Sequence, residues 1–106
     1  MNLALLDCRQ EPFATGPLSV AESRTLCDAL DGWAIEGDAL VKRHRLDGFM
    51  AAMAFAQRVA AMAQEQDHHP DLHIQGGVCT VRWTTHDAGG LTRRDFITAA
   101  RTDALR

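Results

Sequence analysis

Two short turns constrain the fold of this chain more than any other feature. Gly37-Asp38 and Gln75-Gly76-Gly77 each separate two strand-like segments, and the four segments span residues 33–36, 39–45, 71–74 and 78–83. Strands joined by turns this short pair as antiparallel hairpins. The sequence therefore predicts two hairpins, which together supply four antiparallel strands.

Segments with helical spacing of their apolar residues alternate with the two hairpins. The first and the last of these open at capping boxes, Ser19 with Glu22 and Thr92 with Asp95, and the last runs to about Leu105. Three helices in the order α-β-β-α-β-β-α must cover one face of the sheet. We therefore expect an α+β fold, a two-layer domain with a four-stranded antiparallel sheet and three helices on one face.

The longest helical segment, residues 46–66, is rich in Ala and Met and is expected to open at Asp47. Its apolar arc is wide, which suggests packing on the sheet at one side and on another subunit at the other. A broad core face within one chain is the alternative. The strand at residues 78–83 is apolar enough to be a liability if it forms an open sheet edge. We therefore expect a homodimer or homotetramer.

Residues 1–18 show no sustained period and contain Pro12, Gly16 and Pro17, so we expect an irregular N-terminal arm before one domain at residues 19–106. The net charge is −3 with Lys and Arg scattered, which gives no nucleic-acid footprint. No apolar run could span a bilayer, and Asp7 in a start without basic residues argues against a signal peptide. Three widely spaced cysteines favour the cytoplasm over a disulfide framework.

Four of the five histidines fall between residues 64 and 95, and two of them, His68 and His69, stand directly before Pro70. Histidine titrates near neutral pH, so such a cluster suits proton transfer. Three readings stay open from the residues alone. They are acid–base catalysis with His86, a metal site, and purely structural loop residues. Adjacent histidines diverge, and no pair has the spacing of common zinc sites, so a metal is the weakest reading.

Other polar and aromatic residues are expected to be structural. His44 is read as a solvated strand residue among basic neighbours, and His73 as an ordinary strand position. Asp95 is accounted for by its capping box. Trp33 and Trp83 are expected to pack rather than take part in chemistry.

The segment EQDHHPDLHI, followed by TTHDAGGLT and a later Asp, resembles the pterin-4a-carbinolamine dehydratases. This sequence supplies His68, His69, Pro70, His86 and Asp95 at matching spacing. The similarity extends over roughly residues 19 to 103, nearly the whole domain. Two positions depart from the signature: its Glu falls on Gln64, and an expected aromatic residue falls on Gly76.

The resemblance implies an enzyme that dehydrates 4a-hydroxytetrahydropterin to quinonoid dihydropterin during pterin recycling. It implies His68, His69 and His86 as joint acid–base groups, and substrate contacts from Pro70, Thr85, Asp87 and Asp95. It implies no cofactor and no metal, because the pterin is itself the substrate. It also points to a homo-oligomer beside an aromatic amino acid hydroxylase pathway. A weakly catalytic binding or assembly protein on the same fold is the alternative.

Overall fold

The structure, a computed structural model, describes residues 2–11 and 16–106. Its regular elements follow the expected order, and their bounds are α1 Val20–Asp28, β1 Ala34–Glu36, β2 Ala39–Arg45, α2 Phe49–Gln66, β3 Asp71–Gln75, β4 Val78–Trp83 and α3 Arg93–Asp103. Three short 3-10 helices, Leu3–Leu5, Cys8–Gln10 and His86–Ala88, complete the described part of the chain. Both predicted capping boxes are present, at the starts of α1 and α3.

The four strands form one antiparallel sheet in the order β1-β2-β4-β3. Each predicted hairpin is formed, and the two hairpins join through β2 and β4, where Leu40 pairs with Trp83 and His44 with Cys79. The strand β4 is therefore interior, and the open edges belong to β1 and β3. The apolar residues 78–83 are thus not left as an open sheet edge within this chain.

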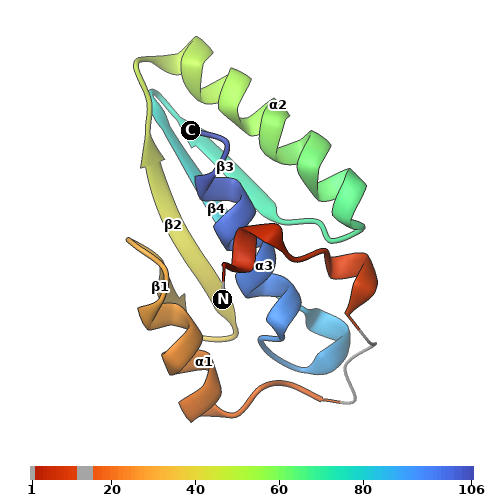
Figure 1. Ribbon diagram of the computed structural model, residues 1–106. Coiled ribbons are helices and arrows are strands. Elements are labelled where there is room, and N and C mark those ends of the chain that lie inside the picture. Colours follow the sequence, from red (N-terminus) through yellow and green to blue (C-terminus); the bar gives the residue numbers. More distant parts are fainter. Residues whose placement is uncertain (1, 12–15) are drawn as a thin grey trace.

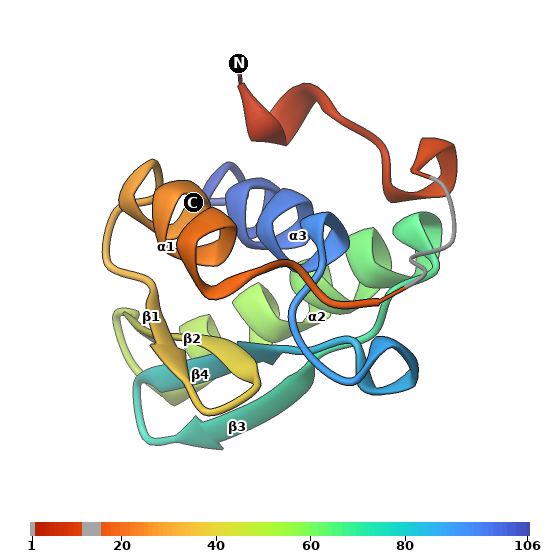
Figure 2. The same cartoon turned by 90° about the horizontal axis from the view of Figure 1, so that it is seen from below.

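All three long helices lie on one face of the sheet, which confirms the two-layer α+β fold (Figures 1 and 2). Alternate residues of β4 point into the layer between sheet and helices, where they meet apolar residues of α2 and α3. The fully buried members of this core include Cys79, Val81, Trp83, Phe55, Val59, Phe96 and Ile97. Full burial of each large apolar side chain contributes about 1.5–3 kcal/mol, so this core holds α2 and α3 on the sheet.

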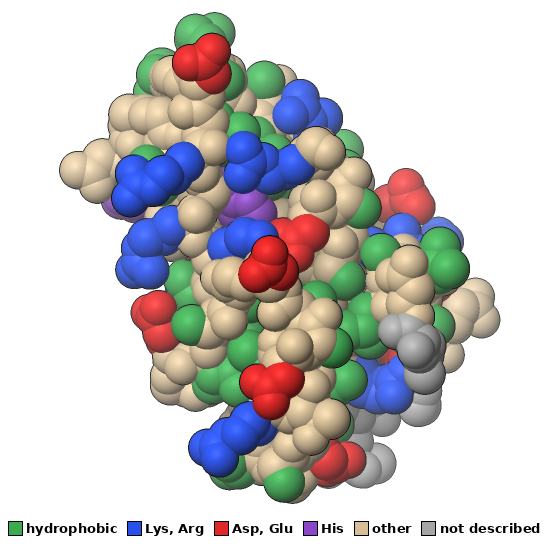
Figure 3. Space-filling view, turned by 60° about the vertical axis from the view of Figure 1, so that its left-hand side comes forward, with side chains coloured by type: hydrophobic (Ala, Val, Ile, Leu, Met, Phe, Trp, Pro, Cys, Tyr) green, Lys and Arg blue, Asp and Glu red, His purple; other side chains and the backbone are tan. Residues whose placement is uncertain are grey.

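The ring of His44 is buried, which corrects its reading as a solvated residue. It is 1% exposed and lies between the rings of Trp33 and Phe55, with centroids 5.8 and 4.8 Å away. Successive strand residues face opposite sides of a sheet, so Arg43 and Arg45 point outward while His44 points to the core. The charged residues next to His44 in the sequence suggested an exposed position and masked this alternation. Figure 3 shows Lys and Arg side chains, in blue, gathered on the upper part of one face of the molecule.

The start of α2 differs from expectation, whereas its end at residue 66 is the expected one. The helix begins at Phe49 after Gly48, whose φ of 103° is a left-handed value suited to glycine, so Asp47 is not its cap. It ends at Gln66, and Asp67 takes a left-handed conformation with φ 52° and ψ 42°. Asp is one of the few residues that tolerates this region. The helix therefore stops before Pro70, at a turn formed by Asp67.

The described part of the N-terminal arm, residues 2–11, lies along α3 (Figure 1). Its two 3-10 helices bury the side chains of Leu3 and Cys8. Of the residues that suggested irregular structure, Pro12 falls outside the described residues, whereas Gly16 and Pro17 precede α1 without regular structure. Over residues 2–11 and 16–106, the helices are too short or too polar for a membrane span.

Candidate active site

The position of His68 follows from the left-handed turn at Asp67. The backbone N–H groups of Asp67 and His68 both donate to the final carbonyls of α2, including that of Ala63. These bonds close the helix and turn the chain toward α3. Pro70 then disfavours helical geometry at His69, and β3 begins one residue later. The adjacent histidines are thus held between a closed helix end and the edge strand.

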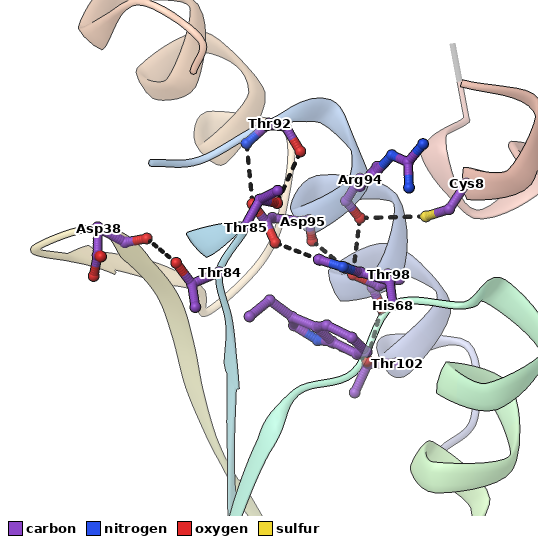
Figure 4. Close-up of polar contacts among 11 residues, drawn as sticks. Cys8, Asp38, His68, Thr84, Thr85, Thr92, Arg94, Asp95, Thr98 and Thr102 are labelled. Atoms are coloured by element: carbon purple, nitrogen blue, oxygen red, sulfur yellow. Dashed lines mark hydrogen bonds and ion pairs between the residues drawn. The ribbon is translucent and has the colours of Figure 1, made fainter. Parts of the chain in front are cut away.

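The carboxylate of Asp95 lies at the centre of a buried polar cluster (Figure 4). Its Oδ1 is 2.6 Å from Nε2 of His68, and its Oδ2 accepts from Oγ1 of Thr85 at 2.8 Å and from the backbone N–H of Thr92 at 3.0 Å. The Asp95 side chain is 0% exposed, whereas that of His68 retains 10% exposure. Asp95 therefore has two roles: it caps α3 and it holds His68.

The bond to Asp95 also fixes how His68 can act. An ionised carboxylate only accepts hydrogen bonds, so Nε2 of His68 carries a proton and Nδ1 is the acceptor of the neutral ring. The ring is stacked on Trp83, with centroids 5.4 Å apart and planes 19° from parallel. Trp83 is itself held by a bond from its Nε1 to Oγ1 of Thr102. Sequence reasoning assigned Trp83 to packing alone and missed this support.

His69 lies on the outside of the same turn. It is exposed, and its Nε2 lies 3.0 Å from Oε1 of Gln64, one helical turn back on α2. The amide oxygen can accept a proton from the ring, but it carries no charge. This is the position at which the dehydratase signature has a glutamate.

His86 is exposed at the start of the 3-10 helix that follows β4. Its predecessor, Thr85, donates to the same carboxylate that holds His68, so Asp95 links the segments bearing the two histidines. Asp87 is exposed one residue further on, and Pro70 is half-buried beside His69. Convergence of the rings of His68, His69 and His86 on one substrate stays a prediction, as does substrate contact by Pro70, Thr85, Asp87 and Asp95.

Gly76 lies away from these groups. It occupies the β3–β4 turn with φ 56°, a conformation that glycine adopts readily. The strand β3 separates it from His69 by roughly 15 Å, at about 3.3 Å per residue. An aromatic residue at this position would therefore not form a wall beside His69 within one chain.

A separate cavity of about 470 Å³ lies between α1, the β1–β2 turn and the loop at residues 89–91. Its described lining residues include Arg24, Asp38 and Gly90, but no histidine. Within residues 2–11 and 16–106, no group of three or more His, Cys, Asp or Glu side chains is placed to hold a metal ion.

Sequence comparisons find a matching family and related proteins. The family model described as pterin 4 alpha carbinolamine dehydratase matches residues 16–105. A protein of Chromobacterium violaceum is 40% identical over 105 residues, which cover 99% of this chain and 96% of its own. A protein of Nitrosospira multiformis is 38% identical over 104 residues, covering 98% and 92%. The names of both assign them provisionally as pterin-4-alpha-carbinolamine dehydratases.

The fold is also similar to a solved structure. The crystal structure of a transcriptional coactivator/pterin dehydratase from Brucella melitensis superposes with a TM-score of 0.79 at 28% sequence identity. The match covers 85% of this chain and 98% of that one. The two-layer architecture is therefore shared over almost the whole of that protein.

Proposed function

The chain belongs to the pterin 4 alpha carbinolamine dehydratase family, and we propose that it dehydrates a 4a-hydroxytetrahydropterin to the quinonoid dihydropterin by histidine acid–base catalysis. The observation that carries this proposal is the pair formed by His68 and Asp95. A histidine with one nitrogen bound to a buried carboxylate and with its ring stacked on an indole has a fixed orientation and a defined tautomer. A fixed orientation and a defined tautomer are what a histidine needs in order to transfer a proton to or from a bound substrate.

The reaction needs one proton given and one proton taken. The hydroxyl on carbon 4a leaves as water after it receives a proton, which breaks the C–O bond. The adjacent ring nitrogen loses its proton, and the electrons of that N–H bond form the new C=N double bond. Atoms and electrons balance without an oxidant or a reductant. An acid and a base beside a flat heterocycle therefore suffice.

We assign the two proton transfers jointly to His68, His69 and His86. Asp95 orients the ring of His68 through the 2.6 Å contact of its Oδ1 with Nε2. Gln64 orients His69 without adding charge. The exposure of His69 and His86 leaves both rings accessible to a substrate that lies over the turn. We expect Pro70, Thr85 and Asp87 to shape the surface around it.

A dehydration assay on chemically generated 4a-hydroxytetrahydropterin tests the proposal. The wild-type protein should accelerate loss of water well above the rate in buffer. Each of His68→Ala, His69→Ala and His86→Ala should lower kcat about 100-fold, the usual contribution of a general acid or base. A wild-type rate equal to that in buffer would overturn the proposal, and an unchanged His69→Ala would remove that residue from the mechanism.

A second candidate is a binding or assembly protein with weak or no catalysis. Gln64, in place of the signature's glutamate, favours it because an amide cannot supply charge to His69. The relative from Brucella melitensis is named both a transcriptional coactivator and a pterin dehydratase. The same assay decides between the two candidates, since only the first requires turnover that the histidine variants abolish.

We also propose the setting of this activity. The three cysteines are free, which suits a reducing cytoplasm. The product is a dihydropterin, so the reaction that consumes it is a reduction and the one that supplies the substrate is a pterin-dependent hydroxylation. An aromatic amino acid hydroxylase pathway would provide both steps.

A further inference from the structure

Cys8, in the N-terminal arm, contacts both of the segments that carry the His68–Asp95 pair. Its backbone N–H donates to Oε1 of Gln66 at 2.8 Å. Its Sγ lies 3.5 Å from the carbonyl oxygen of Arg94, as Figure 4 shows. Gln66 precedes His68 by two residues, and Arg94 precedes Asp95 directly. We propose that the arm, residues 2–11, is a positioning element that holds the end of α2 against the start of α3.

The contacts at Cys8 are buried and specific. Cys8 is 0% exposed and Gln66 is 1% exposed, so the bond between them is shielded from water. The Nε2 of Gln66 has no partner among the described residues, and this amide is nevertheless buried. Burying an amide nitrogen without a partner is unfavourable, and the hydrogen bond to the oxygen of the same amide offsets part of that cost. This oxygen is the one that accepts from Cys8 in the arm.

Cys8 is not equipped for chemistry of its own. Burial raises the pKa of its thiol to about 12, so the thiolate form is scarce at neutral pH. A neutral, shielded thiol acts as a small apolar group with weak hydrogen bonding. Its role in the molecule is therefore to fill the space between Gln66 and Arg94.

Further side chains of α3 hold the arm along its length. Nε of Arg101 donates to the carbonyl oxygen of Leu6 at 2.8 Å, and the guanidinium of Arg94 donates to the carbonyl oxygen of Glu11 at 3.2 Å. Nε of Arg93 donates to the carboxylate of Glu11 at 3.2 Å. These bonds fix the backbone on both sides of Cys8, so they hold Cys8 in contact with Gln66 and Arg94.

The arm lies outside the segment that the family model matches, which begins at residue 16. We expect the arm to act on the His68–Asp95 pair, which is joined by one contact of 2.6 Å. Misplacement of a catalytic group by about 1 Å can lower the rate as much as 100-fold. The role of the arm in turnover rests on the proposed dehydratase function. Its role in holding the pair does not, so the two can be tested separately.

Three variants test the inference. Gln66→Met keeps the volume of the side chain and removes the acceptor for Cys8. Gln66→Met with Arg101→Met removes a second bond to the arm. Arg9→Ala is the matched control, because Arg9 pairs with Asp7 within the arm and is exposed. Circular dichroism establishes that each variant is folded before it is compared.

Alkylation of Cys8, followed by peptide mass spectrometry, measures opening of the arm. It should be at least about tenfold faster in the double variant than in the wild type, since a buried thiol reacts only when the segment opens. Protection of Cys8 in the double variant equal to that in the wild type would overturn the proposal, because the named bonds would then not hold the arm.

Nuclear magnetic resonance of the His68 Nε2–H proton measures the pair itself and needs no substrate. Exchange of this proton with water should be several-fold faster in the two Gln66 variants and unchanged in Arg9→Ala. In the dehydratase assay, kcat should fall about tenfold with KM nearly unchanged, since positioning rather than binding is lost. Faster alkylation of Cys8 with unchanged exchange at His68 would overturn the positioning role. A wild-type protein without turnover would instead count against the dehydratase function alone.

Discussion

Oε1 of Gln64 lies 3.0 Å from Nε2 of His69, at the position where the dehydratase signature has a glutamate. The distance is that of an ordinary hydrogen bond, which the amide of Gln64 makes without the charge of a carboxylate. Both side chains are exposed. Replacing Gln64 by glutamate therefore tests the effect of charge at this position separately from the orientation of His69.

The variant Gln64→Glu should therefore raise dehydratase activity. A carboxylate at the same place makes a charge-assisted bond, roughly twice as strong as a neutral one, and about 1 kcal/mol of added stabilisation corresponds to roughly fivefold in kcat. Steady-state kinetics on 4a-hydroxytetrahydropterin measure the change. Glu65→Gln is the matched control, since a residue one position later points about 100° away on the helix. Equal kcat in Gln64→Glu and wild type would show that charge at this position is irrelevant.

The dual role of Asp95 predicts two separable effects of Asp95→Asn. Loss of the carboxylate partner of His68 should lower kcat by about 100-fold. Weakening of the capping box should lower the free energy of unfolding by about 1 kcal/mol. Ser19→Ala, which removes the corresponding cap of α1, should cost about as much stability and leave kcat unchanged. Similar losses of activity in the two variants would assign the effect of Asp95 to stability alone.

Local patterns in the sequence were sufficient to predict the secondary-structure elements and the two-layer arrangement of this fold. Turns at Gly37 and Gly76 and two capping boxes define the hairpins and the helix starts, because each depends on residues within four positions. The order of the strands has no such local signal. It depends on the pairing of β2 with β4 across more than 30 residues, so the interior position of β4 could not be derived from the chain.

The candidate site shows the same division. The histidines and Asp95 are recognisable by motif, but their connections are not. Asp95 was accounted for by capping, and nothing in its spacing indicates that the same carboxylate also reaches His68, 27 residues away. The contact of Cys8 with Gln66 spans 58 residues, and neither belongs to the motif. Long-range contacts of this kind depend on tertiary packing.

His44 predicts a loss of stability in mild acid. Burial and, to a smaller extent, the charge of Lys42 lower its pKa from 6.5 to about 4. Between pH 6.5 and pH 4 the unfolded chain binds a proton at this position while the folded chain does not, so stability falls as the pH falls through this window. The contribution is at most about 3–4 kcal/mol, since one pKa unit corresponds to about 1.4 kcal/mol. Denaturant unfolding at a series of pH values measures it.

The variant His44→Phe isolates this contribution. Phenylalanine has no proton to gain, and it removes two ring nitrogens that are buried without partners among the described residues. The free energy of unfolding of this variant should therefore depend less on pH between 6.5 and 4. A slope identical to that of the wild type would mean that other groups carry the acid sensitivity.

Removal of divalent metal ions should leave dehydratase activity intact. The leaving hydroxyl can be protonated directly by a charged histidine, so the proposed chemistry has no step that requires a Lewis acid. Exhaustive dialysis against a chelator, followed by the kinetic assay, measures this. Activity that is lost on dialysis and restored by zinc would instead support the hypothesis that the histidines bind a metal ion.

The protein should form at least a dimer in solution. The apolar side chains of Phe49 and Met50 at the start of α2 are 54% and 75% exposed, and the edge of β3 has no partner strand within residues 2–11 and 16–106. An unpaired edge strand and exposed apolar helix residues both favour association. Light scattering at micromolar concentration should give a mass of at least twice 11.6 kDa.

The variant Met50→Lys tests whether α2 contributes to that assembly. A charge at the centre of an apolar interface should shift the protein toward a smaller species, because its desolvation is unfavourable. Val20→Lys is the matched control, since Val20 is 76% exposed in the first turn of α1 and its replacement adds the same charge. We expect the mass of this control to equal that of the wild type. A wild-type mass of one chain would defeat the prediction and leave the exposed start of α2 without a partner.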